Sequence, residues 1–348
     1  MRTLVTNADV DDTRHEQPDH PERPDRLTAA RAGIADLHLG ERLVVVPARA
    51  ATQDELRRVH DPAYLEELGT FCYEGGGDID QDTYATYDSW SIARHAAGAG
   101  LAVIDALSAR GDGVGFVAAR PPGHHATRDR AMGFCLINNI AVAAATLSAR
   151  GERVLIVDWD VHHGNGTQSI FWNDPRVMYV STHQWPLFPG SGGAREVGGP
   201  AALGRTLNVP LPPHAAGDAL RRAFESLVEP EIEGFQPTWV LVSAGFDAHR
   251  DDPMADLELS SGDFAWLASR VARYVRVSGR VALFLEGGYD LVALRRSVAA
   301  TLAVLTDADV ATEAPTHGSV GAEEVRRAHE ERQIALRIAE DTHGIEEQ

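Results

Sequence analysis

Short, continuously apolar runs alternate with helical patterns along most of this chain, and no other feature constrains its fold as much. The apolar runs, rich in valine, isoleucine and leucine, are residues 43–47, 113–118, 154–158, 177–181, 206–210, 239–243 and 281–285. Amphipathic or alanine-rich segments lie between them, at residues 91–110, 139–150, 217–233, 261–278 and 291–305. Apolar strands that alternate with helices form parallel sheets whose two faces are both covered. The sequence therefore predicts an α/β fold, with one parallel β-sheet flanked by helices in a single-domain, three-layer arrangement.

The two ends of the chain depart from this pattern. Residues 1–25 are rich in aspartate, histidine and proline, and we expect an ordered loop or a rim segment there. No internal repeat and no linker rich in proline and serine divides the remainder, so we expect one domain over residues 1–305. Residues 306–348 are expected to form a peripheral, helical and acidic extension. A helix is predicted at 321–338, where it would cap the domain or contact another subunit.

The composition excludes several classes of protein and of chemistry. The formal net charge of −19 disfavours nucleic acid as a partner and favours cationic ligands. All 32 basic residues are arginine, and the absence of lysine excludes Schiff-base, Walker P-loop and Ser–Lys chemistry. Two cysteines cannot build a disulfide framework. No apolar run approaches the roughly 18 residues of a membrane span, so we expect a soluble, cytoplasmic protein without a membrane partner.

Two carboxylates and a histidine follow the apolar run at 154–158, in the sequence Asp158-Trp159-Asp160-Val161-His162. Parallel sheets normally present their ligands at the carboxyl ends of the strands. Because residues i and i+2 of a strand point the same way, we expect Asp160 and His162 to converge on one ion. Aspartate with histidine is a pair that zinc accepts, and it needs a third ligand from elsewhere in the chain.

Three further strand ends carry polar side chains. A Pro-Pro-Gly turn after the run at 113–118 presents the adjacent imidazoles of His124 and His125. Asp247 follows the run at 239–243 and is a candidate for the third ligand, while Tyr289 follows a Gly-Gly turn after the run at 281–285. Each feature alone also fits a plain structural role, such as a helix cap or a packed ring.

Together, these side chains fit the hydrolysis of an amide. An Asp/His/Asp set leaves one zinc coordination position open, as catalytic sites do. Such an ion polarises a carbonyl and acidifies a bound water. A histidine pair can take the proton of that water and return it to a leaving amine. A tyrosine hydroxyl can donate a hydrogen bond to the oxyanion that develops opposite the metal.

Several short motifs stand at these strand ends and in the loops around them. They are HPERP at 20–24, PPGHHA at 121–126, GF at 133–134, INN at 137–139, DWDVHHGNGTQ at 158–168, FPGSG at 188–192, SAGFDA at 243–248 and EGGY at 286–289. Together they resemble the zinc-dependent histone deacetylase family, which has the arginase–deacetylase fold, over roughly residues 1–305. The chain looks closest to the class II-like bacterial members, the histone deacetylase-like amidohydrolases.

The resemblance implies a catalytic machinery and its metals. The zinc ligands would be Asp160, His162 and Asp247. The catalytic residues would be the acid/base pair His124 and His125, their partners Asp158 and Asn165, and the oxyanion donor Tyr289. Asp158 is expected to raise the pKa of His124, whereas neutral Asn165 leaves His125 the better base near neutral pH. The family also binds a structural K⁺, through residues that match Asp158, Asp160, His162, Ser181 and Thr182.

The resemblance also implies how substrate binds. Gly133, Phe134 and Phe188 would wall a narrow tunnel suited to an alkyl chain such as that of acyl-lysine. Asp82 would hold the substrate backbone at the rim of this tunnel. Met254 would gate it, and its lack of charge favours an acylated lysine peptide or a small N-acyl amine over an internal cationic polyamine.

Three alternative functions stay open. The net charge of −19 would suit a cationic amine, so an acetylpolyamine amidohydrolase is the alternative to the acyl-lysine function. An arginase-type dimanganese hydrolase shares the fold, but Asn165 and the histidine pair fit a second metal poorly. A non-catalytic acyl-group reader is disfavoured, because the ligands, the histidines and Tyr289 are all present. The sequence also allows a homo-oligomer.

Overall fold

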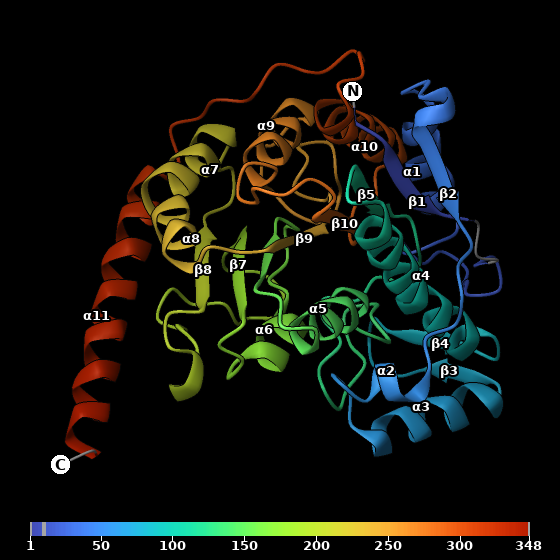
Figure 1. Cartoon of the computed structure of the whole chain (residues 1–348), viewed down its shortest axis with the longest axis horizontal. Helices are drawn as coiled ribbons and strands as arrows, with labels where there is room; N and C mark the ends of the chain where they lie inside the picture. Colours follow the sequence, from blue (N-terminus) through green and yellow to red (C-terminus); the bar gives the residue numbers. More distant parts are fainter. Residues whose placement is uncertain (1, 9–11, 347–348) are drawn as a thin grey trace.

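Eight parallel strands form the central sheet of the computed structural model, which describes residues 2–8 and 12–346. Their order across the sheet is β2-β1-β5-β10-β9-β6-β7-β8. Their bounds are β1 Leu4–Asn7, β2 Leu43–Val46, β5 Val114–Val117, β6 Val154–Asp158, β7 Val177–Gln184, β8 Thr206–Leu211, β9 Trp239–Ala244 and β10 Val281–Leu285. All neighbouring pairs are parallel, so the carboxyl ends of the strands share one edge. This architecture confirms the predicted fold class (Figure 1).

Helices cover both faces of this sheet. One face packs against α4 (Ser89–Arg110) and α5 (Asn139–Ala149), and the other against α1 (Asp25–Ala35), α9 (Ser261–Val271) and α10 (Leu291–Thr306). The remaining helices are α2 Gln53–Leu56, α3 Pro62–Tyr73, α6 Asn165–Phe171, α7 Gly217–Ala223, α8 Glu229–Phe235 and α11 Ala322–Glu346, with short 3₁₀ segments at Gly40–Arg42 and Pro200–Ala202. The three layers of the prediction are therefore present.

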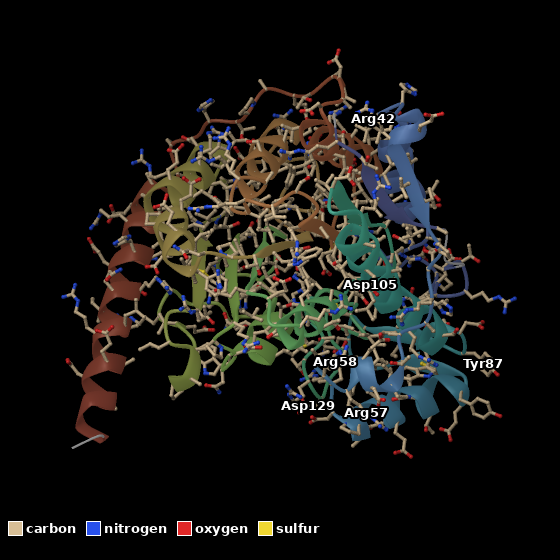
Figure 2. All side chains as sticks on the ribbon, viewed as in Figure 1. Arg42, Arg57, Arg58, Tyr87, Asp105 and Asp129 are labelled. Carbon is tan, nitrogen blue, oxygen red and sulfur yellow. The ribbon has the colours of Figure 1, made fainter. Side chains whose placement is uncertain are left out.

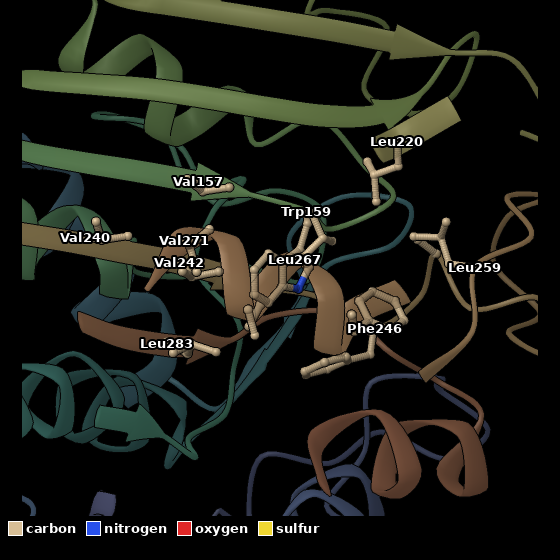
Figure 3. Packing of buried hydrophobic residues seen from close by; sticks show 14 of the residues in the cluster. Val157, Trp159, Leu220, Val240, Val242, Phe246, Leu259, Leu267, Val271 and Leu283 are labelled. Atoms are coloured by element: carbon tan, nitrogen blue, oxygen red, sulfur yellow. The ribbon is translucent and has the colours of Figure 1, made fainter. Parts of the chain in front are cut away.

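Successive residues of the strands feed two separate hydrophobic cores, because strand side chains alternate between the faces of a sheet. In β6, Leu155 and Val157 join the core under α9 and α10, whereas Val154 and Ile156 join the core under α4 and α5. Figure 3 shows the first core around Trp159, beside residues of α9. Full burial of such an aliphatic side chain contributes about 1.5–3 kcal/mol. The strands that carry the site are thus held from both sides.

One strand of the sheet lies inside the segment that was expected to be a loop or rim. β1 pairs with β2 on one side and with β5 on the other. Its four residues end in Thr6 and Asn7, so its apolar pattern is too short to stand out in the sequence. Tertiary contacts satisfy these polar ends, since Thr6 Oγ1 donates to the carbonyl of Phe116 at 2.8 Å and Asn7 Nδ2 to that of Ala118 at 2.9 Å.

Other elements also differ from the prediction. The helix expected at 217–233 consists of α7, a π-helical turn at Phe224–Val228 and α8. Pro230 has no N–H to donate to the carbonyl of Ser226, which favours this irregular turn. Helix α9 ends at Val271, so it is shorter than the helix predicted at 261–278. A small antiparallel hairpin, β3 Gly76–Asp78 and β4 Tyr84–Thr86, was not predicted and lies outside the main sheet.

Helix α11 lies along β8, the strand at one edge of the sheet, and also contacts α7 (Figure 1). The helix predicted at 321–338 is therefore present, and it extends to Glu346. Among the described residues, no helix is both long and apolar enough to cross a membrane.

Candidate active site and metal centre

Three buried side chains converge where β6 and β9 end. Asp160 and His162 lie in the loop after β6, and Asp247 lies in the loop after β9. One ligand-capable atom from each residue lies within 4.8 Å of the other two. His162 Nδ1 is 3.1 Å from Asp160 Oδ1 and 3.2 Å from Asp247 Oδ2. The structure thus brings together the three predicted metal ligands.

Strand geometry is not the reason why Asp160 and His162 converge. β6 ends at Asp158, so the expectation that strand alternation aligns these two side chains is wrong. Backbone donors of the loop orient the carboxylates instead. The N–H of His162 donates to Asp160 Oδ1, and the N–H of Val161 donates to Asp247 Oδ1, each at 2.9 Å.

Two glycines leave room for these carboxylates. A Cβ atom on Gly245 would lie 2.0 Å from Asp160 Oδ2, and one on Gly287 would lie 2.0 Å from Asp247 Oδ2. Real Cβ atoms do not approach other atoms this closely, so any larger residue would displace a candidate ligand. Gly245 and Gly287 therefore leave the space that the candidate metal ligands occupy.

The donor set fits a divalent cation such as zinc. Two carboxylates buried this close together are costly unless a positive charge balances them. Burial, together with the neighbouring Asp160 carboxylate, holds the pKa of Asp247 above its ordinary value. One imidazole nitrogen with two carboxylate oxygens is a set that zinc takes, and it leaves a fourth position for water or substrate.

The two adjacent histidines have different partners. His124 Nδ1 donates to Asp158 Oδ2 at 3.0 Å, and His125 Nδ1 donates to Asn165 Oδ1 at 2.8 Å. The hydroxyl of Tyr179 also donates to Asp158 Oδ2, at 3.0 Å. The ring centroids of the two histidines are 4.0 Å apart. The structure therefore places Asp158 and Asn165 as the sequence prediction expected.

These partners separate the basicities of the two imidazoles. Burial disfavours the charged form of His124, but the carboxylates of Asp160 and Asp158 outweigh it and raise its pKa to about 10. Burial, with the nearby His124 and His162, lowers the pKa of His125 well below its ordinary value. At neutral pH His124 is the charged ring and His125 the neutral one.

A cavity of about 170 Å³ opens beside these histidines. The predicted substrate-binding residues all line it, namely Asp82, Gly133, Phe134, Phe188 and Met254. His124, His125, His162 and Tyr289 line it as well. Gly133 has φ +56, and a Cβ atom there would lie 2.5 Å from the His125 ring, so this position requires glycine.

Sequence reasoning assigned no role to Glu286, although it stands in the EGGY motif. Its side chain is buried, and Oε2 accepts the N–H groups of Gly123 at 2.7 Å and His124 at 3.2 Å. Burial raises the pKa of Glu286 to about 7. The next residue, Gly287, donates its N–H to Asp160 Oδ2 at 2.8 Å. This dipeptide thus ties the histidine turn to Asp160, one of the candidate metal ligands.

A buried ion network behind Tyr289 was also not predicted. Arg26 donates to the carbonyls of Glu286 and Gly288, and its guanidinium carbon lies 4.6 Å from the centroid of the Tyr289 ring. The carboxylate of Glu22 links two arginines. It accepts a hydrogen bond from Arg26 at 2.9 Å and two hydrogen bonds from Arg120, each at 2.5 Å. Glu22 of the HPERP motif is four residues from Arg26, but nothing in the sequence spacing links it to Arg120, 98 residues away.

Three residues of the predicted K⁺ site, Asp158, Ser181 and Thr182, lie at the β6–β7 pair, and the other two, Asp160 and His162, lie in the loop after β6. Asp158 and Ser181 are register partners there, and Thr182 is the next residue of β7. Ser181 Oγ is 2.9 Å from His183 Nδ1. Binding of K⁺ stays a prediction.

A parallel sheet with this triad, histidine pair and tunnel tyrosine at its carboxyl edge defines a hydrolase of the arginase–deacetylase fold. A family model described as "Histone deacetylase domain" matches residues 20–305, and the chain belongs to that family. The predicted resemblance is therefore confirmed.

Individual relatives agree with this assignment. The chain is 39% identical over 276 residues to a histone deacetylase-like amidohydrolase of Pseudomonas aeruginosa, covering 78% of this chain and 73% of that protein. It is 40% identical over 311 residues to a probable deacetylase of Methanothermobacter thermautotrophicus, covering 88% and 92%. The crystal structure of the HDA15 HD domain superposes with a TM-score of 0.88 at 34% identity, over 98% of each chain. The family and these relatives support a deacetylase or amidohydrolase activity.

Proposed function

We propose that this chain is a zinc-dependent amidohydrolase that removes acetyl or other acyl groups from acyl-lysine or related N-acyl amines. One observation carries the proposal: the triad, the histidine pair and Tyr289 meet around one apolar-walled cavity. Asp160, His162 and Asp247 would hold the zinc, which when bound polarises the acyl carbonyl and acidifies a water. Membership of the histone deacetylase family supports the same class of reaction.

His125 acts as the general base in this proposal. Its Nδ1 hydrogen is engaged by Asn165 Oδ1, so the lone pair of Nε2 is free to take a proton from the attacking water. Burial and the charged ring of His124 keep His125 neutral, and a neutral imidazole is the form that acts as a base. His124 remains charged through its bond to Asp158, and the pair returns a proton to the leaving amine.

Tyr289 stabilises the oxyanion. Burial raises the pKa of its phenol well above the ordinary value, so the hydroxyl stays protonated and remains a donor. Its ring is held between Arg26 and Phe134, whose centroid lies 5.9 Å away in an edge-to-face arrangement. Such preorganised donors act without a reorganisation cost at the moment of reaction.

The cavity walls support an acyl-lysine substrate. Phe188 packs edge-to-face on His125 at 5.0 Å, so an alkyl chain between Phe134 and Phe188 would reach the histidines. Met254 brings no charge that would pair with an internal ammonium of a polyamine. Asp82 lines the cavity with a carboxylate that suits the backbone N–H groups of a peptide.

The test is an acyl-substrate panel run on the zinc-loaded chain and on its Tyr289→Phe variant. We expect hydrolysis of acyl-lysine substrates by the first, and a kcat lower by about 10²–10³-fold in the second, because one oxyanion donor is lost. Chelation should abolish turnover, and elemental analysis should find one zinc per active chain. Full turnover by Tyr289→Phe, or two manganese ions per chain, would contradict the proposed mechanism.

The net charge of −19 is the one observation that favours acetylpolyamines as the alternative substrates, since it attracts cationic amines. A side-by-side assay of an acetyl-lysine peptide and N-acetylputrescine separates the two functions. We expect a higher kcat/KM for the peptide. Comparable values on both substrates would remove the preference for acyl-lysine.

A further inference from the structure

A second hollow of the surface, of about 280 Å³, adjoins the loops that form the tunnel. Its apolar lining consists of Tyr64, Leu68 and Phe71 of α3 with Ile79 and Ala131. Its charged lining consists of Glu67, Asp78, Asp129 and Arg130. We call this hollow the flanking groove.

The flanking groove and the tunnel share a wall. Ile79 lines the groove and Asp82 lines the tunnel, and in the same way Ala131 lines the groove and Gly133 the tunnel. Ile79 and Asp82 are three positions apart in the chain. Since an extended chain advances at most about 3.6 Å per residue, no more than about 11 Å separates their backbones. A peptide with one side chain in the tunnel therefore reaches the groove with a residue two or three positions away.

Hydrogen bonds hold this wall in place. The carboxylate of Asp80 accepts the N–H groups of Asp82 at 3.1 Å and Thr83 at 2.9 Å. Asp80 also lies 3.7 Å from the guanidinium of Arg130. Thr83 Oγ1 in turn accepts the N–H of Phe134 at 3.1 Å. The position of the groove relative to the tunnel is thus built into the fold.

The charges around the groove are predominantly negative. Among the described residues that line it, Arg130 is the only cation, and it is already paired with Asp80. Asp78 and Asp129 accept hydrogen bonds from the neutral side chains of Gln17 at 3.1 Å and Thr127 at 3.0 Å, so their charges are not balanced. Figure 2 places Asp129 at the surface, in the same region of the molecule as α3. The groove therefore attracts a cation next to an apolar group.

We propose that the flanking groove is a subsite for a peptide substrate, which binds an apolar residue beside a basic one, two or three positions from the acyl-lysine. The inference rests on the proposed function and deepens it, because such a subsite distinguishes a peptide from a small N-acyl amine. The apolar floor takes the first side chain, and the carboxylates of Glu67, Asp78 and Asp129 take the second. The groove adds affinity without touching the reacting atoms.

The test compares three substrates on the zinc-loaded chain. They are a capped acetyl-lysine, a peptide with Leu-Arg starting two residues from the acetyl-lysine, and the same peptide with Gly-Ser there. We expect the Leu-Arg peptide to have the highest kcat/KM. In Glu67→Arg, its advantage over the capped acetyl-lysine should fall about fivefold, as expected for an exposed charge pair.

Glu66→Arg is the matched control, because Glu66 is an exposed neighbour on α3 that does not line the groove. It should keep the advantage of the Leu-Arg peptide. Equal effects of Glu66→Arg and Glu67→Arg would overturn the subsite proposal, and so would equal kcat/KM values for the two peptides. In either case, hydrolysis of the capped acetyl-lysine would still support the proposed function.

A binding measurement keeps the two proposals separate. Fluorescence polarisation of the labelled peptides on the zinc-loaded Tyr289→Phe chain reports on the groove even if nothing is hydrolysed. Tighter binding of the Leu-Arg peptide, lost in the Glu67→Arg background, supports the subsite. Conversion of a dimer to a monomer by Glu67→Arg in sedimentation velocity would show that a second copy of the chain occupies the groove, and would overturn it.

Discussion

At the scale of single residues, Glu286 has a role that the acid/base residues do not explain. Its carboxylate is the acceptor for two buried N–H groups of the histidine turn, at Gly123 and His124. We expect Glu286→Ala to lower the free energy of unfolding by about 2–5 kcal/mol, because it leaves both donors unsatisfied and opens a cavity. Denaturant unfolding measures this loss.

Glu286→Gln is the control for this prediction. Its amide oxygen still accepts the two N–H groups and its volume is nearly the same, so most of the stability should return. If Gln and Ala destabilise the fold equally, the acceptor role of Glu286 is wrong.

The different partners of the two histidines lead to a second prediction at this scale. His125→Ala should lose nearly all turnover, since it removes the ring with a free Nε2 lone pair, and a general base contributes about 10²–10⁴-fold. Single-turnover kinetics with a fluorogenic acyl-lysine measure the chemical step. Near-full turnover in His125→Ala together with none in His124→Ala would reverse the assignment.

At the scale of elements, a buried histidine supports the start of α5. Asn138 caps this helix by accepting the N–H of Ala141 at 3.0 Å, and its own N–H donates to His60 Nε2 at 3.0 Å. His60 Nδ1 donates to the carbonyl of Thr127 at 2.8 Å, so both ring nitrogens are used in the neutral form. Burial lowers the pKa of His60 to about 4.

This lowered pKa predicts a loss of stability in mild acid. The unfolded chain titrates near the ordinary value of 6.5 and takes up the proton first, so the stabilisation is complete above about pH 6.5 and declines toward pH 4. The free energy of unfolding should fall by on the order of 3 kcal/mol over this pH range. Denaturant unfolding between pH 7 and pH 4.5 measures the slope of the free energy of unfolding against pH. His60→Gln should give a less stable chain with a shallower slope, and an unchanged slope would rule out His60 as its source.

The sequence predicts the elements whose signal is local. Apolar runs indicate β6, β9 and β10 correctly, because each strand is buried on both faces. β1 escapes prediction, since half of its four residues are polar and depend on hydrogen bonds to the distant residues Phe116 and Ala118. The motifs likewise predict the residues of the site but not its scaffold, because no spacing rule relates Arg26 to Tyr289 or Glu22 to Arg120.

At the scale of the whole molecule, the C-terminal residues close one edge of the sheet. Val325 and Ala328 of α11 are buried, and Arg332 donates to the carbonyls of Thr206 at 2.5 Å and Gly204 at 2.8 Å. The connection before α11 is also fixed, since Thr316 Oγ1 donates to Asp263 Oδ2 at 2.8 Å. The boundary predicted at residue 305 stays a prediction, and a truncation that tests α11 alone must be placed after residue 320.

Truncation after residue 320 should separate stability from catalysis. It removes the helix that covers β8, so we expect the free energy of unfolding to fall by about 3 kcal/mol or more. We also expect aggregation to rise, because an exposed strand edge pairs with other chains. None of the residues that line the tunnel cavity comes from α11, so kcat/KM per folded chain should persist.

Truncation after Thr342 is the control, since it keeps Val325, Ala328 and Arg332. Circular dichroism melting and active-site titration with a tight inhibitor measure the two quantities. A folded truncated chain without activity would show that α11 supports catalysis itself, because only an effect on the site can remove turnover from a folded molecule.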